Sequence, residues 1–428
     1  MTKRYPDRAA PFLSTQPIRQ ICRRRFLKLL AGGSALSLGA LTARSQGIMP
    51  IERPPDPILW APREILRIIS DPSEALSVFD FEAAMMKKVP PAHFGYMATG
   101  IDDEATVRGN RDGFQRFQLR PRRLVDVSSI DTTCEIFGVR YDSPIVIAPT
   151  GSNKAFHADG EVAVARAAKA GNHLQILSTV ATTSIEEAIA ARGAPIWFQL
   201  YPTERWEIGD ALAKRAERAG CSTIVLTVDT LGRQKWETYE RLRRTDTRQC
   251  GSCHAQGTYL SRKPNFEGLQ LGATASTISP NLTWDYVKRL RDVTRAKLVL
   301  KGILAPEDAR LAVESGIDGI IVSNHGGRAE DGSGSTIEAL PEVIDAVGGR
   351  IPVLIDSGFR RGTEIVKALA IGARAVCVGR PYLWGLGAFG QAGVERVLQI
   401  LRSETHAAMQ QAGAPTIKHL TPAMVRRV

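Results

Sequence analysis

Short runs of apolar residues recur along the chain from residue 144 onward, and amphipathic segments separate them. Each run has the length of a β-strand and is apolar at consecutive positions, which is the pattern of a parallel strand buried on both faces. We therefore predict eight parallel strands, at residues 144–150, 175–179, 195–201, 223–229, 297–302, 319–325, 352–358 and 375–381.

Helix-like segments lie between most of these runs, for example at 159–170, 205–219, 306–315 and 362–371. Such a succession of strand–helix units is typical of a (β/α)8 TIM barrel, an α/β fold. A doubly wound sheet is the weaker alternative, because no Gly-x-Gly-x-x-Gly turn follows the first run. The barrel is predicted over residues 144–428, after a Pro-rich linker and an N-terminal helical extension over residues 47–143.

One connection is far longer than the others. The stretch between Asp229 and Lys297 exceeds the few residues that a strand–helix loop needs. A helix at 283–294 accounts for its end, and the remainder, residues 231–281, is called the lid below. Because excursions of this length are commonly functional, we expect the lid to cover the mouth of the barrel.

Basic residues are concentrated at the start of the chain. The formal net charge is +12, but residues 1–46 hold nine basic side chains and one acidic one. A basic leader on a nearly neutral body is a poor footprint for nucleic acid, so we expect no nucleic-acid partner.

The leader carries a recognisable pattern. Arg23-Arg24-Arg25-Phe26-Leu27-Lys28 precedes an apolar stretch at 29–41, as in a twin-arginine export signal. The stretch is shorter than the roughly 20 residues that span a bilayer. We expect residues 1–46 to be an export signal and the protein to be periplasmic or exported. An uncleaved anchor and membrane association stay open, because the cleavage site is weak.

In a TIM barrel the chemistry lies where the strands end. Any one polar residue there is commonly structural, but a base, several cations and glycines at the same level point to a site. His325 ends a strand, two glycines follow it, and Arg328 comes three positions later. The pair offers a proton acceptor beside a carboxylate-binding guanidinium. Asp229 ends another strand and is placed to orient the imidazole, or else to cap a helix or anchor a loop.

The last two strands end in glycines and arginines. They are followed by Asp356-Ser357-Gly358-Phe359-Arg360 and by Gly379-Arg380. Glycines let backbone N–H groups approach a phosphate and arginines add charge, so these loops favour a phosphorylated cofactor.

The ordered motifs resemble one known family. Ala-Pro-Thr, Phe-Gln-Leu-Tyr, Thr-Val-Asp-Thr, Val-Lys-Gly, Ser-Asn-His-Gly-Gly-Arg, Asp-x-Gly-x-Arg-Arg-Gly and Gly-Arg-Pro occur in this order. The chain is similar, from about Phe79 to its C-terminus, to the FMN-dependent α-hydroxy-acid dehydrogenases and oxidases. That family includes glycolate oxidase, L-lactate dehydrogenase and mandelate dehydrogenase.

The resemblance implies a role for each matching residue. His325 is the base, Asp229 pairs with its protonated ring, Arg328 binds the substrate carboxylate, and Tyr96 and Tyr201 place hydroxyls near the substrate. The residues implied to contact FMN are Thr150, Ser178, Gln199 and Thr227 at the ring, Lys301 at its N1 edge, and Ser323, Asp356, Gly358, Arg360, Gly379 and Arg380 at the ribityl chain and phosphate.

The chain departs from the family in two places near the substrate. Gln234 stands where a second carboxylate-binding arginine aligns, and Arg233 or Lys235 is the available substitute. A lysine lacks the bidentate fork of an arginine. Val180 replaces an aromatic residue and implies a more open pocket.

The lid also contains Cys250-Gly251-Ser252-Cys253-His254, the attachment pattern of a c-type haem. A disulfide, a small metal site and free thiols are the alternatives. Cys134, Cys221 and Cys377 lie in core-like surroundings and are expected to be buried apolar residues.

The prediction is therefore an exported enzyme that uses FMN to oxidise an L-2-hydroxy acid, lactate by default, to the 2-oxo acid. The electron acceptor is left open between oxygen, a quinone and a cytochrome, and homo-oligomer formation is compatible with the resemblance. Two other hypotheses stay open: another FMN-dependent TIM-barrel enzyme, of the isomerase or nucleotide dehydrogenase type, and an electron-transfer protein that uses a haem at Cys250, Cys253 and His254.

Overall fold

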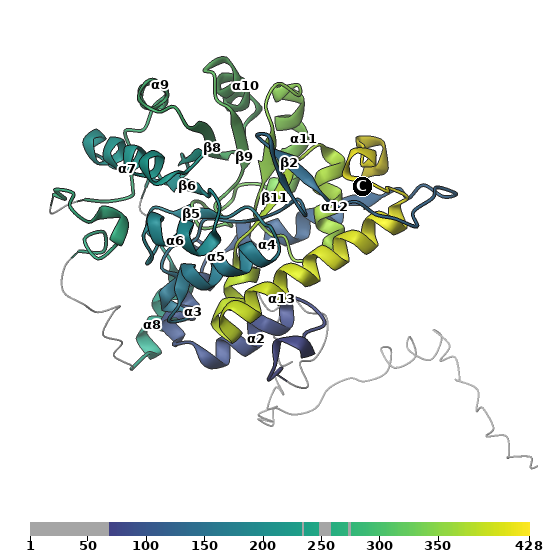
Figure 1. Ribbon diagram of the computed structural model, residues 1–428, viewed down its shortest axis with the longest axis horizontal. Helices are drawn as coiled ribbons and strands as arrows, with labels where there is room; N and C mark the ends of the chain where they lie inside the picture. The colour runs from purple at the N-terminus through teal and green to yellow at the C-terminus, as the bar shows by residue number, and fades with distance from the viewer. Residues whose placement is uncertain (1–67, 233–234, 248–257, 273–274) are drawn as a thin grey trace, which may run out of the picture. The chain divides into compact units, whose positions relative to one another are not determined.

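The computed structural model describes residues 68–428 except 233–234, 248–257 and 273–274. Eight parallel strands form one sheet in the order β4-β11-β10-β9-β8-β7-β6-β5 (Figure 1). They are β4 (Ile145–Ile147), β5 (Ile176–Ser178), β6 (Trp197–Leu200), β7 (Thr223–Thr227), β8 (Lys297–Ile303), β9 (Gly319–Val322), β10 (Val353–Ile355) and β11 (Ala375–Val378). A parallel bridge between Ile147 and Gln175 joins the two edge strands. The sheet is thus a closed (β/α)8 barrel, and the predicted TIM-barrel fold is confirmed.

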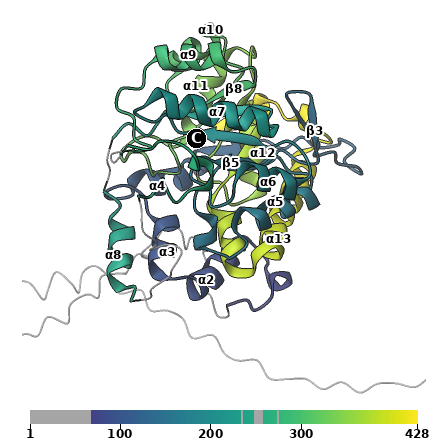
Figure 2. The same cartoon turned by 60° about the vertical axis from the view of Figure 1, so that its left-hand side comes forward.

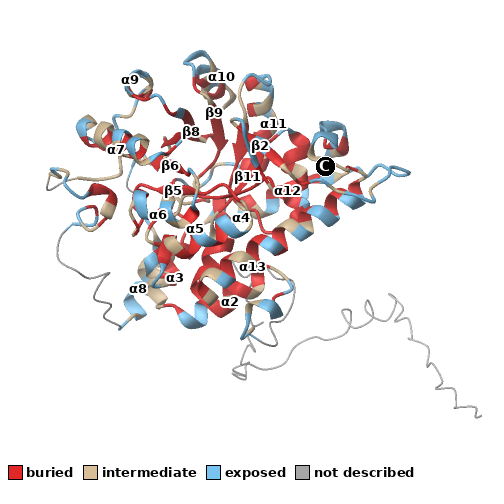
Figure 3. Cartoon of the chain, viewed as in Figure 1, coloured by how far each residue is buried: buried red, intermediate tan, exposed pale blue. Residues whose placement is uncertain are grey.

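The two-sided burial of the strands explains their continuous apolar sequence. Alternate residues, such as Val146, Val225 and Ile321, pack with one another inside the barrel. Their neighbours, such as Ile147, Leu226 and Ile320, pack against the surrounding helices. Figure 3 shows buried residues along the strands and exposed residues on the outer faces of the helices.

A hairpin closes the N-terminal end of the barrel. Strands β2 (Cys134–Ile136) and β3 (Val139–Tyr141) pair antiparallel, and their buried side chains belong to the cluster inside the barrel. At its turn, the ring of Phe137 lies 5.4 Å from that of Trp197, at the start of β6. Because this end is filled, the opposite end, where the strands finish, is the end that is left for a site.

The outer helices are α5 (Gly160–Ala170), α6 (Ile185–Arg192), α7 (Trp206–Ala219), α9 (Trp284–Val293), α10 (Pro306–Glu314), α11 (Thr336–Val347), α12 (Gly362–Ile371) and α13 (Arg380–Ala412). The helices predicted at 159–170, 205–219, 283–294, 306–315 and 362–371 correspond to α5, α7, α9, α10 and α12 and are confirmed. Local sequence sets their ends: α6 begins with a capping box between Ser184 and Glu187, and it ends at Gly193 with φ +70°. All the strands except β8 end earlier than predicted, because the polar residues at their C-terminal ends turn into loops, whereas β8 runs one residue further, to Ile303.

The N-terminal extension contains α2 (Phe79–Lys88), α3 (Pro91–Ala98) and α4 (Ala105–Asp112). Helix α2 packs on α13, and α3 lies beside α8 (Glu237–Thr245) of the lid (Figure 2). Strand β1 (Phe117–Leu119) pairs with the C-terminal β12 (Val425–Arg427). The predicted domain boundaries stay predictions, and the leader at 1–46 lies outside the described residues. Over the part of the chain that is described, no helix is long and apolar enough to cross a membrane.

Candidate active site

A cavity of about 640 Å³ opens at the C-terminal ends of the strands. Its wall brings together eleven residues that the sequence had singled out across the whole chain. They are Tyr96, Thr150, Tyr201, Lys301, His325, Arg328, Asp356, Gly358, Arg360, Gly379 and Arg380. This volume lies within the range of cofactor and ligand pockets.

A hydrogen bond joins His325, at this wall, to Asp229. Nδ1 of His325 lies 2.8 Å from Oδ1 of Asp229, and Nε2 lies 3.1 Å from the hydroxyl of Tyr201. Burial works to raise the pKa of Asp229, but the charges of His325 and Lys301 outweigh it and hold this pKa below its ordinary value. The carboxylate is therefore anionic and stabilises a positive charge on the imidazole.

Arg328 is fixed by the N-terminal extension. Its Nη1 donates to the carbonyl oxygens of Tyr96, at 2.6 Å, and Thr99, at 3.1 Å. The guanidinium carbon lies 5.1 Å from the ring centre of Tyr96 and 4.8 Å from that of Trp236. Backbone oxygens and aromatic faces thus hold the cation at the cavity wall without neutralising it.

Lys301 brings a second cation to the wall. Its ammonium donates to Oγ of Ser323 at 2.9 Å and lies 3.3 Å from Oδ2 of Asp356. Burial works to lower the pKa of Lys301, but the carboxylates of Asp356 and Asp229 outweigh it and raise this pKa. Lys301 therefore keeps its positive charge although only 4% of the residue is exposed.

Arginines and glycines gather at the end of the cavity near β10 and β11. Arg380 donates to the carbonyl oxygens of Gly326 and Thr99, while Arg360 is buried with its guanidinium 4.6 Å from the ring centre of Trp384. Burial, together with the charges of Arg111 and Arg380, lowers the pKa of Arg360 to about 9. The carboxylates of Glu82 and Glu364 offset part of this repulsion, and a bound anion stabilises the buried cations further.

Comparison with known proteins identifies the family. The sequence profile of the family described as FMN-dependent dehydrogenase matches residues 85–427. The chain belongs to this family.

Relatives agree over most of their length. The chain is 42% identical to L-lactate oxidase of Lysinibacillus sphaericus (strain C3-41), over 80% of this chain and 90% of the relative. It is 41% identical to glycolate oxidase 1 of Oryza sativa subsp. indica, over 82% and 96%. A solved structure of a mutant chimera of (S)-mandelate dehydrogenase superposes with a TM-score of 0.75 at 36% identity, over 82% of this chain and 99% of that one. A mandelate oxidase structure superposes with a TM-score of 0.73 at 37% identity, over 82% and 98%.

The described residues fit the FMN of this family. The cluster of Arg360 and Arg380 lies beside Gly358, where an added Cβ would come within 2.3 Å of the carbonyl oxygen of Asn110. A phosphate is the anion that such a cluster and glycine loop accommodate. Lys301 lies on the same wall and suits the negative charge of a reduced flavin ring.

The four residues implied at the flavin ring lie at neighbouring strand ends. Ser178 donates to Oε1 of Gln199 at 3.1 Å, and the amide of Gln199 donates to Thr227 at 2.9 Å. These three hydrogen-bonded side chains do not line the cavity, and in the structure they bond to one another. Thr150 lines the cavity, and its hydroxyl bonds to that of Tyr382, at the start of α13.

Several residues of the cavity wall were not predicted from the sequence. Trp236 and Tyr239, at the start of α8, and Tyr259, in the lid, line the cavity. The spacing of Trp236 and Tyr239, three positions apart on a helix, was a usable signal that they share one face. Val180 lines the cavity, whereas Arg233, Gln234, Cys250, Cys253 and His254 lie outside the described residues, and Lys235 is exposed.

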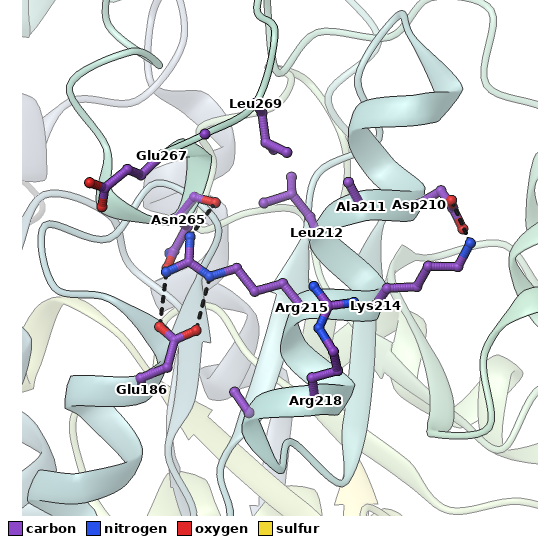
Figure 4. A pocket seen from close by; sticks show the side chains of 12 residues that line it. Glu186, Asp210, Ala211, Leu212, Lys214, Arg215, Arg218, Asn265, Glu267 and Leu269 are labelled. Atoms are coloured by element: carbon purple, nitrogen blue, oxygen red, sulfur yellow. Dashed lines mark hydrogen bonds and ion pairs between the residues drawn. The ribbon is translucent and has the colours of Figure 1, made fainter.

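A second pocket, of about 670 Å³, lies between α6, α7 and the lid (Figure 4). At its centre the guanidinium of Arg215 binds both oxygens of Glu186 and the carbonyl oxygens of Pro264 and Asn265. Hydrogen bonds within the protein thus satisfy Arg215. We interpret this pocket as the junction that attaches the lid to the barrel.

Proposed function

We propose that the protein oxidises an L-2-hydroxy acid to the 2-oxo acid, with FMN as its cofactor. The observation that carries this proposal is the pairing of His325 with Asp229 on the same cavity wall as Arg328. A base, its orienting carboxylate and a carboxylate-binding cation are the groups that removal of hydrogen from a 2-hydroxy acid requires. An isomerase or a nucleotide dehydrogenase has no need of this combination.

Each of these residues has a separate role in the proposed reaction. Arg328 binds the carboxylate of the acid, and the hydroxyls of Tyr96 and Tyr201 orient the hydroxyl-bearing carbon. Because Asp229 occupies Nδ1 of His325, the imidazole accepts the substrate proton at Nε2, the nitrogen that faces Tyr201. Asp229 then stabilises the imidazolium. FMN, when bound, supplies the acceptor of the two electrons.

The substrate is proposed to be small, with lactate as the first candidate. The relatives named L-lactate oxidase and glycolate oxidase act on small acids. Val180, Trp236 and Tyr259 line the cavity, and we propose that they set which side chain of the acid is preferred.

Anaerobic mixing of the FMN-loaded protein with L-lactate, glycolate and L-mandelate tests the proposal. We expect the visible flavin absorption to bleach with an L-acid and to persist with D-lactate. Persistence of the absorption with every L-acid contradicts the proposal. Reoxidation with oxygen, a quinone or a cytochrome c then identifies the acceptor.

The same spectrum tests the haem pattern at Cys250, Cys253 and His254. An electron-transfer protein of the c type shows a sharp haem band that does not depend on the acid, and its presence supports that second function.

Export is proposed from the leader alone. The Arg23-Arg24 pair with Phe26, Leu27 and Lys28 supports the twin-arginine route. We expect the Arg23→Lys/Arg24→Lys variant to stay in the cytoplasm of a host that has this pathway, while the parent reaches the periplasm. Equal export of both contradicts the proposal.

A further inference from the structure

Gly302 lies in an irregular stretch of β8, next to Lys301. The register of β8 against β9 shifts between Lys301 and Ile303, and Gly302 has φ +114°. The carbonyl oxygen of Lys301 accepts a hydrogen bond from the N–H of Val228 at 2.9 Å. This bond joins β8 to the residue just before Asp229, so the backbones of the two strand ends are held together.

No side chain fits at position 302 without moving Asp229. A Cβ built there would lie 2.8 Å from Cβ of Asp229, 2.9 Å from its Cγ and 3.0 Å from its Oδ2. Real Cβ atoms essentially never make contacts this short with a Cβ atom. Gly302 is therefore in close contact with the carboxylate that bonds to His325.

The two carboxylate oxygens of Asp229 differ in their hydrogen bonds. Oδ1 binds His325 at 2.8 Å, while Oδ2 is buried and, among the described residues, makes no hydrogen bond. Among the described residues, no hydrogen bond therefore fixes the side of the carboxylate that lies against Gly302. A group at position 302 would push the carboxylate, and no hydrogen bond at Oδ2 would oppose the displacement.

We infer that Gly302 is a positioning residue of the oxidation, which acts by leaving the space in which Asp229 holds His325. The inference rests on the proposed function, and it assigns to Gly302 an effect that acts through Asp229 and not through contact with the substrate or FMN. It predicts that the effect of any side chain at position 302 depends on the side chain at position 229.

A double-mutant cycle tests this dependence. The variants are Gly302→Ala, Asp229→Gly and Gly302→Ala/Asp229→Gly, and the substitution at 229 removes every atom that the new Cβ would meet there. We expect Gly302→Ala to slow flavin reduction by roughly 100-fold in the parent, the scale of a small misplacement of a catalytic group. In the Asp229→Gly background the same substitution should cost less than about threefold.

Gly220→Ala is the matched control for backbone strain. Gly220 has φ +99°, and an added Cβ would meet nothing within 4 Å. It ends α7, before β7 begins, and so lies at the other end of the barrel. We expect this variant to lose some thermal stability and to reduce its flavin at the parent rate.

Two readouts do not depend on turnover. Gly302→Ala should lower the melting temperature of the parent by more than Gly220→Ala does. When Gly302→Ala is made in the Asp229→Gly variant, the loss should be no larger than that caused by Gly220→Ala. In NMR spectra of protein with 15N-labelled histidine, the Nδ1 proton signal of His325, assigned with His325→Ala, should shift in Gly302→Ala and stay unchanged in Gly220→Ala.

An unchanged reduction rate in Gly302→Ala, or equal fold-losses in both backgrounds, overturns the inference. If none of the 2-hydroxy acids reduces the flavin of the parent protein, the proposed function fails instead. The melting temperatures and the NMR signal then still decide whether Gly302 positions Asp229.

Discussion

At the scale of single residues, His325 takes a backbone conformation that residues other than glycine seldom adopt. Its φ is +58°, and its N–H donates to Oγ of Ser323 at 3.0 Å. Such strain costs on the order of 1–3 kcal/mol and persists only where the surrounding structure holds it. Here Gly326 and Gly327, both also at positive φ, continue the turn. The turn directs the imidazole back toward Asp229, so the strain is part of how the base is positioned.

His325→Ala should retain bound FMN and lose flavin reduction by the acid. The base is removed while the cations near the phosphate are left in place, so we expect a loss of about 10²- to 10⁴-fold. Stopped-flow absorbance under anaerobic conditions measures the rate. His406→Ala, at an exposed position on α13, is the control. Reduction of the His325 variant at the parent rate would remove this residue from the chemistry.

Asp229 should also make the stability of the protein depend on pH. Its pKa in the folded protein is below the ordinary value of 3.8. The stabilisation is therefore fully present above that value and is lost as the pH falls through the lower, folded-state pKa. Urea unfolding between about pH 5 and pH 3 should show a steeper loss for the parent than for Asp229→Asn. Curves of equal slope would show that Asp229 contributes nothing to acid sensitivity.

At the scale of elements, one short turn of the lid makes a buried attachment to the barrel. Asn265, within the 3-10 helix Pro264–Phe266, donates to the carbonyl oxygens of Ser178 and Thr179 at 3.3 and 3.1 Å. Its own Oδ1 accepts the N–H of Ile185 at the start of α6. One fully buried amide thus joins the lid to the end of β5 and to a helix N-terminus.

Asn265→Ala should destabilise the fold by about 1–3 kcal/mol, because it removes the partner of the buried N–H of Ile185 and of the carbonyl oxygen of Thr179. Chemical denaturation measures the free energy of unfolding. Gln270→Ala, at an exposed position of the lid, is the control and should change it by less than about 0.5 kcal/mol. Equal effects at both positions would show that the lid is not attached through Asn265.

At the scale of the whole molecule, FMN binding and folding are linked. The eight strand ends bring Lys301, Arg360 and Arg380 to one cavity from distant parts of the chain. The carboxylates of Glu82 and Glu364 offset part of the repulsion between the buried arginines, and an anionic ligand that binds only the folded state raises the stability of the protein further.

Arg360→Met should weaken FMN binding by about 10- to 100-fold, the worth of a charge-assisted hydrogen bond, without lowering the melting temperature of the FMN-free protein. Flavin fluorescence titration and thermal unfolding measure the two quantities. Arg218→Met, at an exposed position on α7, should change neither. A marked fall in the melting temperature of the FMN-free variant would show that Arg360 is a structural cation.

The amino-acid sequence by itself determined the strands, the outer helices and the level at which the chemistry lies. Continuous apolar runs, helix-like segments between them and the residues that end each run are local properties, and local burial and backbone preference set them. Tertiary structure decided everything that depends on segments far apart in the chain: the hairpin inside the barrel, the bond of Thr150 to Tyr382, the aromatic wall at Trp236, and the contact of Gly302 with Asp229. Each of these depends on which strand and loop ends closure of the barrel brings together, and no pattern within one segment carries that information.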